Sequence, residues 1–226
     1  MGEDLFEGHD GRELYTVLLD KRWQLDDLTI FSKAYEESYF AVFGLLSVTG
    51  ELPGDHAAKL RVARAFRSYP WLGGYSAVNF FGELKRAVPR RERPTVQKIT
   101  YASPGFIELF LDQHVAVQIG AAVTSICGTI KLANSTYHSV YKGYIERRLA
   151  QVSLEKAQLD LDRDKLNFIA ESNAKLCNIL SIQSVDKLNI HTGNELRTLK
   201  ILLAVYRRLQ KLAKLQAKGK ISLPRD

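Results

Sequence analysis

Residues 113–130 (QHVAVQIGAAVTSICGTI) restrict the fold of this chain most, because they carry no charged side chain at neutral pH. A segment of 18 such residues is long enough to cross a bilayer as one helix. However, only six of them are strongly apolar, and His114 and Gln118 oppose insertion. The segment also follows directly on a predicted strand that ends at Asp112. We therefore expect a buried, closely packed helix, with a membrane span as the alternative.

Small residues in this segment indicate how the expected helix packs. Gly120, Thr124 and Gly128 are four residues apart and share one face, which lets another helix approach closely. Three larger residues in the charged region that follows recur at intervals of seven, and they are further candidates for helix packing: Leu154, Leu161 and Phe168.

Three segments are rich in β-branched and aromatic residues, as strands are. The first is ELYTVLLD, residues 13–20, and two more lie within TVQKITYASPGFIELFLD, residues 95–112, around a Ser-Pro-Gly turn. Residues 25–46 repeat apolar side chains at helical spacing. These patterns predict a predominantly helical α+β fold, with a small antiparallel sheet of about three strands packed by helices.

Helical patterns occupy nearly everything after the predicted hairpin. The segment 144–182 has few helix breakers, and its two apolar rows lie on opposite sides. We expect one long helix or two there, packed between two partners or extending to another subunit. The chain divides into a small α+β domain, 1–112, and a helical region, 113–226, or it forms one continuous domain.

The net charge of +7 is unevenly distributed along the chain. Residues 1–54 have a net charge of −7, whereas residues 55–98 and 196–226 have net charges of +7 and +8. Such blocks attract each other within the fold, between subunits, or towards a polyanion.

The last predicted helix, residues 193–218, begins with a T-x-x-E capping box at Thr192 and Glu195 and has one apolar and one basic side. The basic residues fall within an arc of roughly 120° on a helical wheel: Arg197, Lys200, Arg207, Arg208, Lys211, Lys214 and Lys218. This side is solvated or paired with the acidic N-terminal block, or it binds nucleic acid, an anionic membrane or an acidic protein.

The other basic block brings arginines close to aromatic residues in the sequence. Its candidates for contact with nucleic acid or an anionic partner are Arg64, Arg67, Arg90, Arg91 and Arg93, with Tyr69, Trp71 and Tyr75 nearby. Arginines interleaved with aromatic rings can hold a single strand by charge and stacking. The alternative, which we favour, is that the rings belong to the core and the arginines are solvated.

The sequence contains no catalytic or metal-binding motif. The five histidines lack HxxxH or HExxH spacing, and P-loop, GxGxxG and GxSxG motifs are absent. Cys127 and Cys177 lie in apolar contexts without CxxC spacing, which is typical of core thiols in a reducing cytoplasm. We therefore expect a cytoplasmic protein that is not an enzyme and that uses neither a cofactor nor a metal.

Residues 97–112, which include KITYASPGFIELFLD, follow an N-terminal strand and helix and precede a small-residue helix and a long charged helix. In this outline the chain is similar to small bacterial proteins of unknown function from conflict and defence operons. The resemblance implies a bacterial accessory protein, with antiviral defence as its setting, and assigns no functional residue.

These observations lead to one functional expectation and two alternatives. We expect a non-enzymatic interaction or assembly module, an accessory or regulatory protein that oligomerises through its helices or binds a partner protein. The first alternative is a nucleic-acid-binding protein that uses residues 55–98 and 196–225. The second is a membrane-acting effector that inserts residues 113–130.

Overall fold

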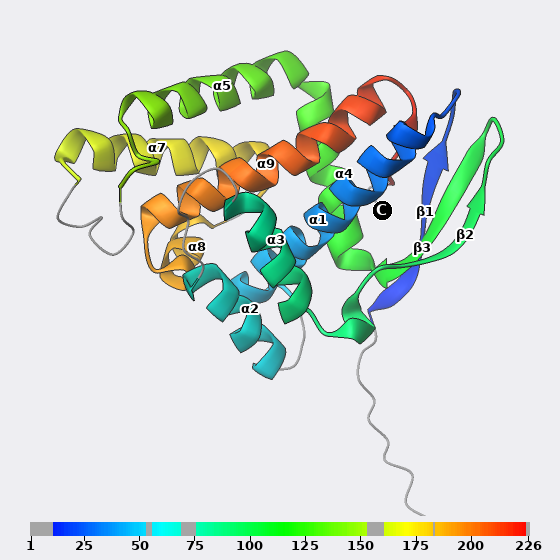
Figure 1. Ribbon diagram of the computed structural model, residues 1–226, viewed down its shortest axis with the longest axis horizontal. Coiled ribbons are helices and arrows are strands. Elements are labelled where there is room, and N and C mark those ends of the chain that lie inside the picture. Colours follow the sequence, from blue (N-terminus) through cyan, green and yellow to red (C-terminus); the bar gives the residue numbers. More distant parts are fainter. Residues whose placement is uncertain (1–10, 53–55, 69–75, 153–160, 183, 225–226) are drawn as a thin grey trace, which may run out of the picture.

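The computed structural model describes residues 11–52, 56–68, 76–152, 161–182 and 184–224. Within these ranges, helices surround a long central helix, and a small antiparallel sheet lies on one side of them (Figure 1). This arrangement confirms the predicted fold class, a predominantly helical α+β protein.

Four strands form the sheet: β1 (Arg12–Leu19), β2 (Thr95–Thr100), β3 (Gly105–Asp112) and β4 (Ile221–Ser222). Their order in space is β2-β3-β1-β4, and each neighbouring pair is antiparallel. The sequence predicted the first three strands. β4 has only two residues, too few to show an alternating pattern.

The two faces of the sheet differ in burial. The face towards the helices carries the buried residues of the two central strands, which are Tyr15, Val17, Leu19, Ile107, Leu109 and Leu111. α4 (Gln113–Gly128) packs against β1 and β3 on this face. On the outer face Leu14 and Leu18 are 62% and 50% exposed.

α1 (Leu25–Thr49) is the longest helix in the first half of the chain. It begins at a capping box formed by Gln24 and Asp27 and ends at Gly50, whose φ of 81° lies in the left-handed region. Every residue from Glu37 to Thr49 is buried. A helix that is buried on all sides belongs to the centre of a fold.

The uncharged segment 113–130 contains the buried helix α4 and the start of α5 (Ile130–Glu146). Val115, Ile119 and Val123 of α4 are completely buried. None of the helices in the described ranges is by itself long and apolar enough to cross a membrane. Only α4 and α5 taken together meet that test, and they are bent by 94° at their junction.

The sequence led to an expectation of one long helix or two at 144–182, and the single continuous helix is not present. α5 ends at Glu146, the chain turns, and α7 (Arg163–Ile179) begins at Asp162, which caps it. The expectation rested on the lack of Gly and Pro, but a helix also ends and restarts where a capping side chain satisfies the free N–H groups. Residues 153–160 lie outside the described part of the chain.

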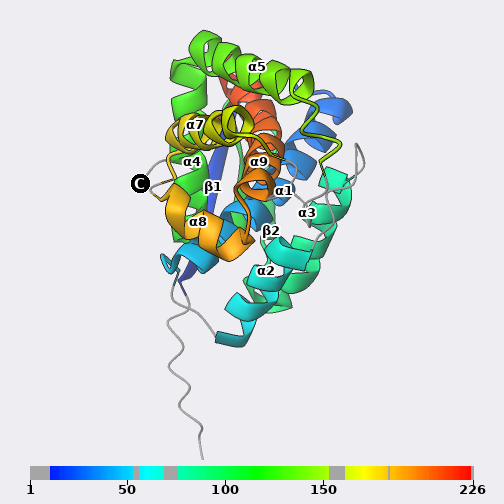
Figure 2. The same cartoon turned by 90° about the vertical axis from the view of Figure 1, so that its left-hand side faces the viewer.

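α8 (Val185–Thr192) and α9 (Glu195–Ala217) take the place of the single helix start expected at Thr192. Thr192 ends α8, and Asn194 caps α9 by accepting from two backbone N–H groups. The predicted capping box of Thr192 and Glu195 is therefore wrong, because a second helix ends where it was placed. α9 runs between α1 and α7 (Figure 2).

α2 (His56–Ser68) and α3 (Ser76–Ala87) pack against α1, and the 3-10 helix η1 (Arg90–Glu92) leads into β2. The buried side chains form one hydrophobic core with members from both sides of position 112. The ranges 1–112 and 113–226 thus share a core, as in a continuous domain.

Candidate functional site

The predicted basic side of α9 does not form one exposed surface, because α1, α4 and α7 cover much of this helix. Lys200 is only 5% exposed, and Arg207 is half-buried. The predicted residues that remain exposed lie near the end of the helix: Lys211, Lys214 and Lys218.

Arg208 belongs to a buried ion pair. Its guanidinium pairs with the Glu37 carboxylate of α1, and both side chains are 12% exposed. It also lies 4.6 Å from the ring centre of Phe81 in α3, a favourable cation–π distance. The pair joins the acidic N-terminal block to the basic C-terminal block within one chain.

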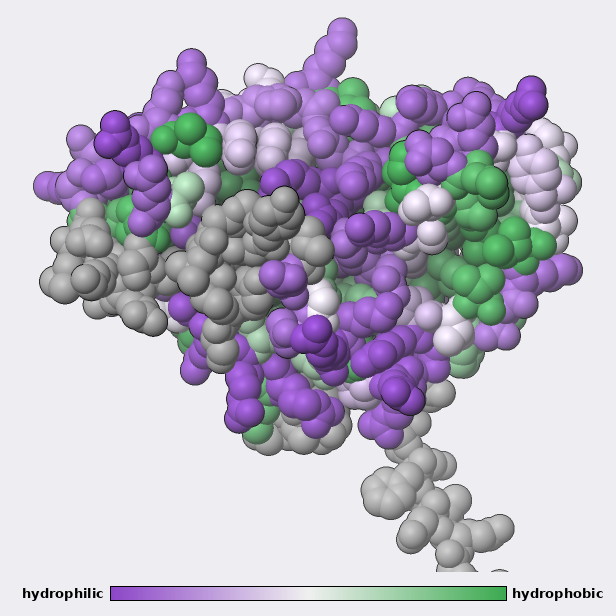
Figure 3. Space-filling view, viewed as in Figure 1, coloured by the Kyte–Doolittle hydropathy of each residue, from purple (hydrophilic) through white to green (hydrophobic). Residues whose placement is uncertain are grey.

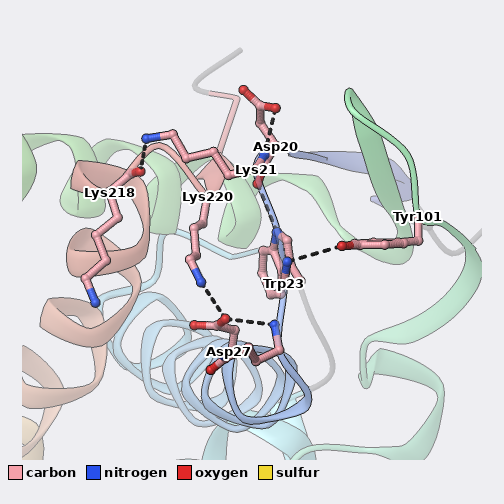
Figure 4. A network of polar contacts seen from close by, with 8 residues as sticks. Asp20, Lys21, Trp23, Asp27, Tyr101, Lys218 and Lys220 are labelled. Atoms are coloured by element: carbon pink, nitrogen blue, oxygen red, sulfur yellow. Dashed lines mark hydrogen bonds and ion pairs between the residues drawn. The ribbon is translucent and has the colours of Figure 1, made fainter.

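A second set of contacts between these blocks joins the loop after β1 and the first turn of α1 to the end of α9 and the residues after it (Figure 4). Lys220 Nζ lies 2.5 Å from the Asp27 carboxylate, and Lys21 Nζ donates to the Lys218 carbonyl at 2.5 Å. Hydrogen bonds from Lys220 and then from the Gln24 backbone lower the pKa of Asp27. These contacts give this part of the basic block a structural role.

The basic loop before β2 has a buried part and an exposed part. Arg93 is half-buried, its Nε donates to the Val88 carbonyl at 3.2 Å, and its carbonyl accepts from Arg12 at 3.0 Å. Arg90 and Arg91 are exposed. Arg93 therefore shapes the loop, whereas Arg90 and Arg91 lie at the surface.

Two predicted residues from different basic blocks meet at the end of α8. Arg67 of α2 donates to the carbonyls of Ile190 and His191, and Arg197 of α9 donates to the carbonyl of Thr192. Arg64 is exposed on α2. The aromatic residues next to this block in sequence lie outside the described residues: Tyr69, Trp71 and Tyr75.

An open groove of about 530 Å³ lies between α1 and the edge of the sheet. α1 forms one wall, β2 forms the other, and β3 forms the floor. The apolar lining consists of Leu28, Phe31, Val96, Ile99, Ile107 and Leu109.

Val96 and Ile99 of β2 face this groove. They are 58% and 52% exposed, although their partners on β3, Leu109 and Ile107, are buried. All four side chains lie on the inner face of the sheet. That face is therefore covered over its central strands and open over its β2 edge.

Tyr35 adds a polar group to the apolar wall. Its side chain is buried, and its hydroxyl has no hydrogen-bond partner among the described residues. Burial raises the pKa of Tyr35 well above its ordinary value. Along α1, the rings of Trp23, Phe31 and Tyr35 form a row with centroid distances of 6.1 and 5.6 Å.

Charged side chains surround the groove. Lys33 on α1 is exposed, whereas Glu36 already pairs with Lys85 of α3 at 2.5 Å. Figure 3 shows hydrophobic atoms, in green, gathered at the right of the molecule, over the space between α1 and the strands, with hydrophilic residues around them. The groove is thus an apolar patch with a polar rim, as binding surfaces commonly are.

The outer face of the sheet is partly covered by its own cations. Arg12 lies 4.3 Å from the ring centre of Phe110, and Lys98 lies 5.2 Å from that of Phe106. Both stacks shield aromatic rings from water. On the groove side of the sheet, Val96 and Ile99 of β2 are more than half exposed.

The small residues of α4 have three different surroundings. A Cβ at Gly120 would collide with the Pro224 carbonyl, and Thr124 accepts a hydrogen bond from Gln216 of α9 at 3.3 Å. Nothing lies within 4 Å of a Cβ at Gly128. Gly120 and Thr124 are therefore packing positions, and the expectation for Gly128 was wrong because α4 ends there.

The structure does not place the other packing candidates, Leu154, Leu161 and Phe168, on one continuous helix. Leu161 and Phe168 are half-buried, and Leu154 lies outside the described residues. The Phe168 ring lies under Arg147 at 4.1 Å and against Gly143, where a Cβ would collide with it. The seven-residue spacing did not identify Gly143 as a packing position. A glycine inside a helical pattern could have indicated it.

Side chains suited to metal binding or nucleophilic chemistry are not gathered in the described ranges. No group of three or more His, Cys, Asp or Glu residues there could hold a metal ion. Burial raises the pKa of the Cys177 thiol to about 12, and Cys127 is half-buried. A thiol in such surroundings packs as a small apolar residue.

Comparisons with protein-family models, curated proteins and solved structures give no match to this chain. The sequence patterns did not single out the groove, because its walls come from α1 and β2, far apart in the chain. One signal was available. Val96 and Ile99 are three residues apart on the same face, which departs from strict alternation and marks the irregularity between Val96 and Lys98.

Proposed function

We propose that this chain is a non-enzymatic interaction module, whose groove between α1 and β2 binds an acidic amphipathic helix of a partner protein. The observation that carries the proposal is the exposure of Val96 and Ile99, 58% and 52%, on a sheet face that is otherwise buried. An accessory or regulatory role, which the outline resemblance implies, agrees with a chain that acts by docking.

A helix suits this site better than an added strand. The register of β2 shifts between Val96 and Lys98, and a bulge and a lysine on an edge strand both oppose pairing with another strand. A helix is about 10 Å across. Placed beside α1, it would continue the helical layer over β2 and cover both exposed side chains.

The rim favours a partner with acidic flanks. Lys33 lines the groove, and Arg90 and Arg91 are exposed in the loop that leads to Pro94 at one end of it. The one carboxylate in the lining, that of Glu36, is already bound by Lys85. Acidic residues on the partner would therefore speed its association and fix its orientation.

The expected affinity is modest. Full burial of a Val or Ile side chain contributes about 1.5–3 kcal/mol, so the half-exposed Val96 and Ile99 contribute about 1 kcal/mol each. Gains of this size are typical of a transient complex.

A displayed library of 16-residue peptides, about four helical turns, tests the proposal. Selection is made on the wild-type chain in the presence of excess soluble Ile99→Lys variant, which removes peptides that bind elsewhere. We expect selected peptides to carry apolar residues at i, i+3, i+4 and i+7 with acidic residues between them. Their binding to Ile99→Lys should be weaker by about tenfold or more, which corresponds to about 1.4 kcal/mol.

The matched control is Leu132→Lys on α5, which alters an apolar side chain that is 68% exposed and distant from the groove lining. This variant should bind the selected peptides like the wild type. Peptides with a two-residue alternation would contradict the helix, and peptides that bind both variants equally would contradict the site.

Self-association is a separate outcome that would overturn the proposal. Sedimentation also tests the expected assembly through the helices, whose segment 144–182 is divided between the end of α5 at Glu146 and α7. If sedimentation shows a dimer of the wild-type chain that Ile99→Lys dissociates, the occupant of the groove is a second copy and not a partner helix.

A further inference from the structure

The ends of three helices bring basic side chains together away from the groove. Arg67 lies in the last turn of α2, His191 in the last turn of α8, and Arg197 in the first turn of α9. α8 contacts both α2 and α9. Lys200 follows one turn after Arg197, so the junction gathers four cations or potential cations.

Two arginines bind the C-terminal carbonyls of α8. Arg67 donates through Nε to His191 at 2.9 Å and through Nη2 to Ile190 at 3.1 Å, and Arg197 donates through Nη1 to Thr192. A guanidinium carries five N–H donors, and the exposed Arg67 uses two groups, Nε and Nη2, in these bonds. Arg197 Nε is buried without a hydrogen-bond partner among the described residues. N–H donors that these carbonyls do not use therefore remain at this junction.

The charges at the junction repel one another. Burial, followed by Arg67, lowers the pKa of His191 and that of Arg197. Burial, followed by Arg197, lowers the pKa of Lys200 to about 8. No carboxylate of the described residues lies within 4 Å of the Arg67 or Arg197 guanidinium.

The C-terminus of α8 offsets only part of this positive charge. A helix end corresponds to about half an elementary charge, and two guanidinium groups already bind it. Glu195 is exposed at the start of α9, and Asp186 is exposed in the first turn of α8, at its opposite end. An additional anion would therefore lower the electrostatic energy of the junction.

We propose that Arg67, Arg197 and His191 form a binding site for a phosphate-type oxyanion at the junction of α2, α8 and α9. The guanidinium groups would donate to its oxygens, as in other phosphate sites. Arg67 is exposed while Arg197 and His191 are half-buried, so the ligand would enter from the surface and rest against the interior. This site does not depend on the groove or its partner.

A phosphate titration of the wild-type protein tests the site without any substitution. The probe is inorganic phosphate at constant ionic strength, with chloride as the reference salt. The NMR signal of the His191 ring reports binding, because an adjacent anion favours the charged imidazole and raises its pKa. We expect a saturable shift and a higher His191 pKa in phosphate than in chloride; no shift, or the same shift in chloride, would overturn the proposal.

Substitutions then assign the donors. Arg67→Gln and Arg197→Gln should each weaken phosphate binding by about tenfold or more, because each removes a charge-assisted hydrogen bond to the anion. Arg61→Gln is the matched control, because Arg61 is exposed on the same helix as Arg67, and it should leave the affinity unchanged within about twofold. Equal loss in all three variants would indicate a general charge effect and would contradict the site.

A single-stranded oligonucleotide without a terminal phosphate separates a small oxyanion from nucleic acid. We expect it not to displace phosphate from the junction at physiological salt. If it binds with a steep salt dependence while inorganic phosphate does not bind, the junction is part of a nucleic-acid surface and the small-anion site is wrong.

Discussion

α4 and β2 carry similar apolar residues in opposite situations. Val115, Ile119 and Val123 of α4 are fully buried, whereas Val96 and Ile99 of β2 are more than half exposed. α4 packs against α1, α9 and β1, whereas β2 pairs with β3 along one edge and lines the open groove. Apolar composition therefore does not decide burial; the number of neighbouring elements does.

The buried side chains of α4 stabilise the fold, whereas the exposed side chains of β2 are free to contact a partner. Changes around α1, α4 and α9 should alter the free energy of unfolding, and changes on β2 should alter binding alone. Four measurements test whether the buried and the exposed side chains differ in this way.

The largest loss is expected at the buried pair of Arg208 and Glu37. Arg208→Met leaves the Glu37 carboxylate buried without its cation, which should lower the free energy of unfolding by about 3–5 kcal/mol. Urea denaturation followed by circular dichroism measures this loss. The control combines Arg208→Met with Glu37→Gln, which removes the isolated charge and should recover a large part. A single-variant loss below about 1 kcal/mol would be typical of a surface pair.

The buried Lys200 of α9 should make the free energy of unfolding depend on pH. Its pKa is lowered from 10.5 to about 8, by burial and then by Arg197. Between these values the unfolded chain binds more protons than the folded one, so the free energy of unfolding should rise with pH. The Lys200 contribution should reach at most about 3 kcal/mol, at 1.36 kcal/mol per pKa unit.

Buried groups with a raised pKa oppose this rise, and Cys177 and Tyr206 are two of them. The pKa of Cys177 is raised from 9.0 to about 12, and that of Tyr206 from 10.0 to about 12, so both favour unfolding as pH increases above their ordinary values. The measurement is therefore the difference in the free energy of unfolding between the wild type and Lys200→Met, followed by chemical denaturation from about pH 7 to about pH 10.5. Parallel profiles would mean that the Lys200 amine is not desolvated.

Gly120→Leu should lower the free energy of unfolding by about 1–3 kcal/mol, because overpacking strains a closed site. Its Cβ would meet the Pro224 carbonyl, beside the Tyr15 hydroxyl. Gly128→Leu on the same helix is the control, since a Cβ there meets nothing within 4 Å. Thermal denaturation of both variants measures the difference, and equal midpoints would refute the close packing of α4.

The smallest change in stability is expected on β2. Ile99→Thr keeps a β-branched side chain at an exposed position, so the free energy of unfolding should change by less than about 0.5 kcal/mol. Peptides selected on the wild type should nevertheless bind the variant more weakly. A stability loss above about 2 kcal/mol would show that Ile99 already belongs to the core.

Local patterns predicted most elements but not their surroundings. The strand at 12–19, the hairpin at 95–112 and the burial of 113–130 follow from short-range alternation and composition. Pairing of the basic side of α9 with the acidic N-terminal block was one expected alternative, but a helical wheel shows direction and not which side chain lies opposite. Glu37 lies there, more than 150 positions earlier in the chain.

The candidate site was less predictable than the fold. The basic residues were identified by type, but whether each one forms an ion pair, binds a helix end or remains exposed depends on tertiary contacts. Arg67 and Arg197 meet only because α8 contacts both α2 and α9. The groove depends on where the helical layer ends over the sheet, which no local pattern specifies.

Trp23, which lies just before α1, allows binding in the groove to be followed by fluorescence. The Trp23 ring is half-buried and meets the ring of Phe31 edge-on at 6.1 Å, and Phe31 lines the groove. The sequence contains only one other tryptophan, Trp71. A Trp71→Phe chain would therefore emit from a single indole beside the groove, and its fluorescence would follow the arrival of an occupant without any attached dye.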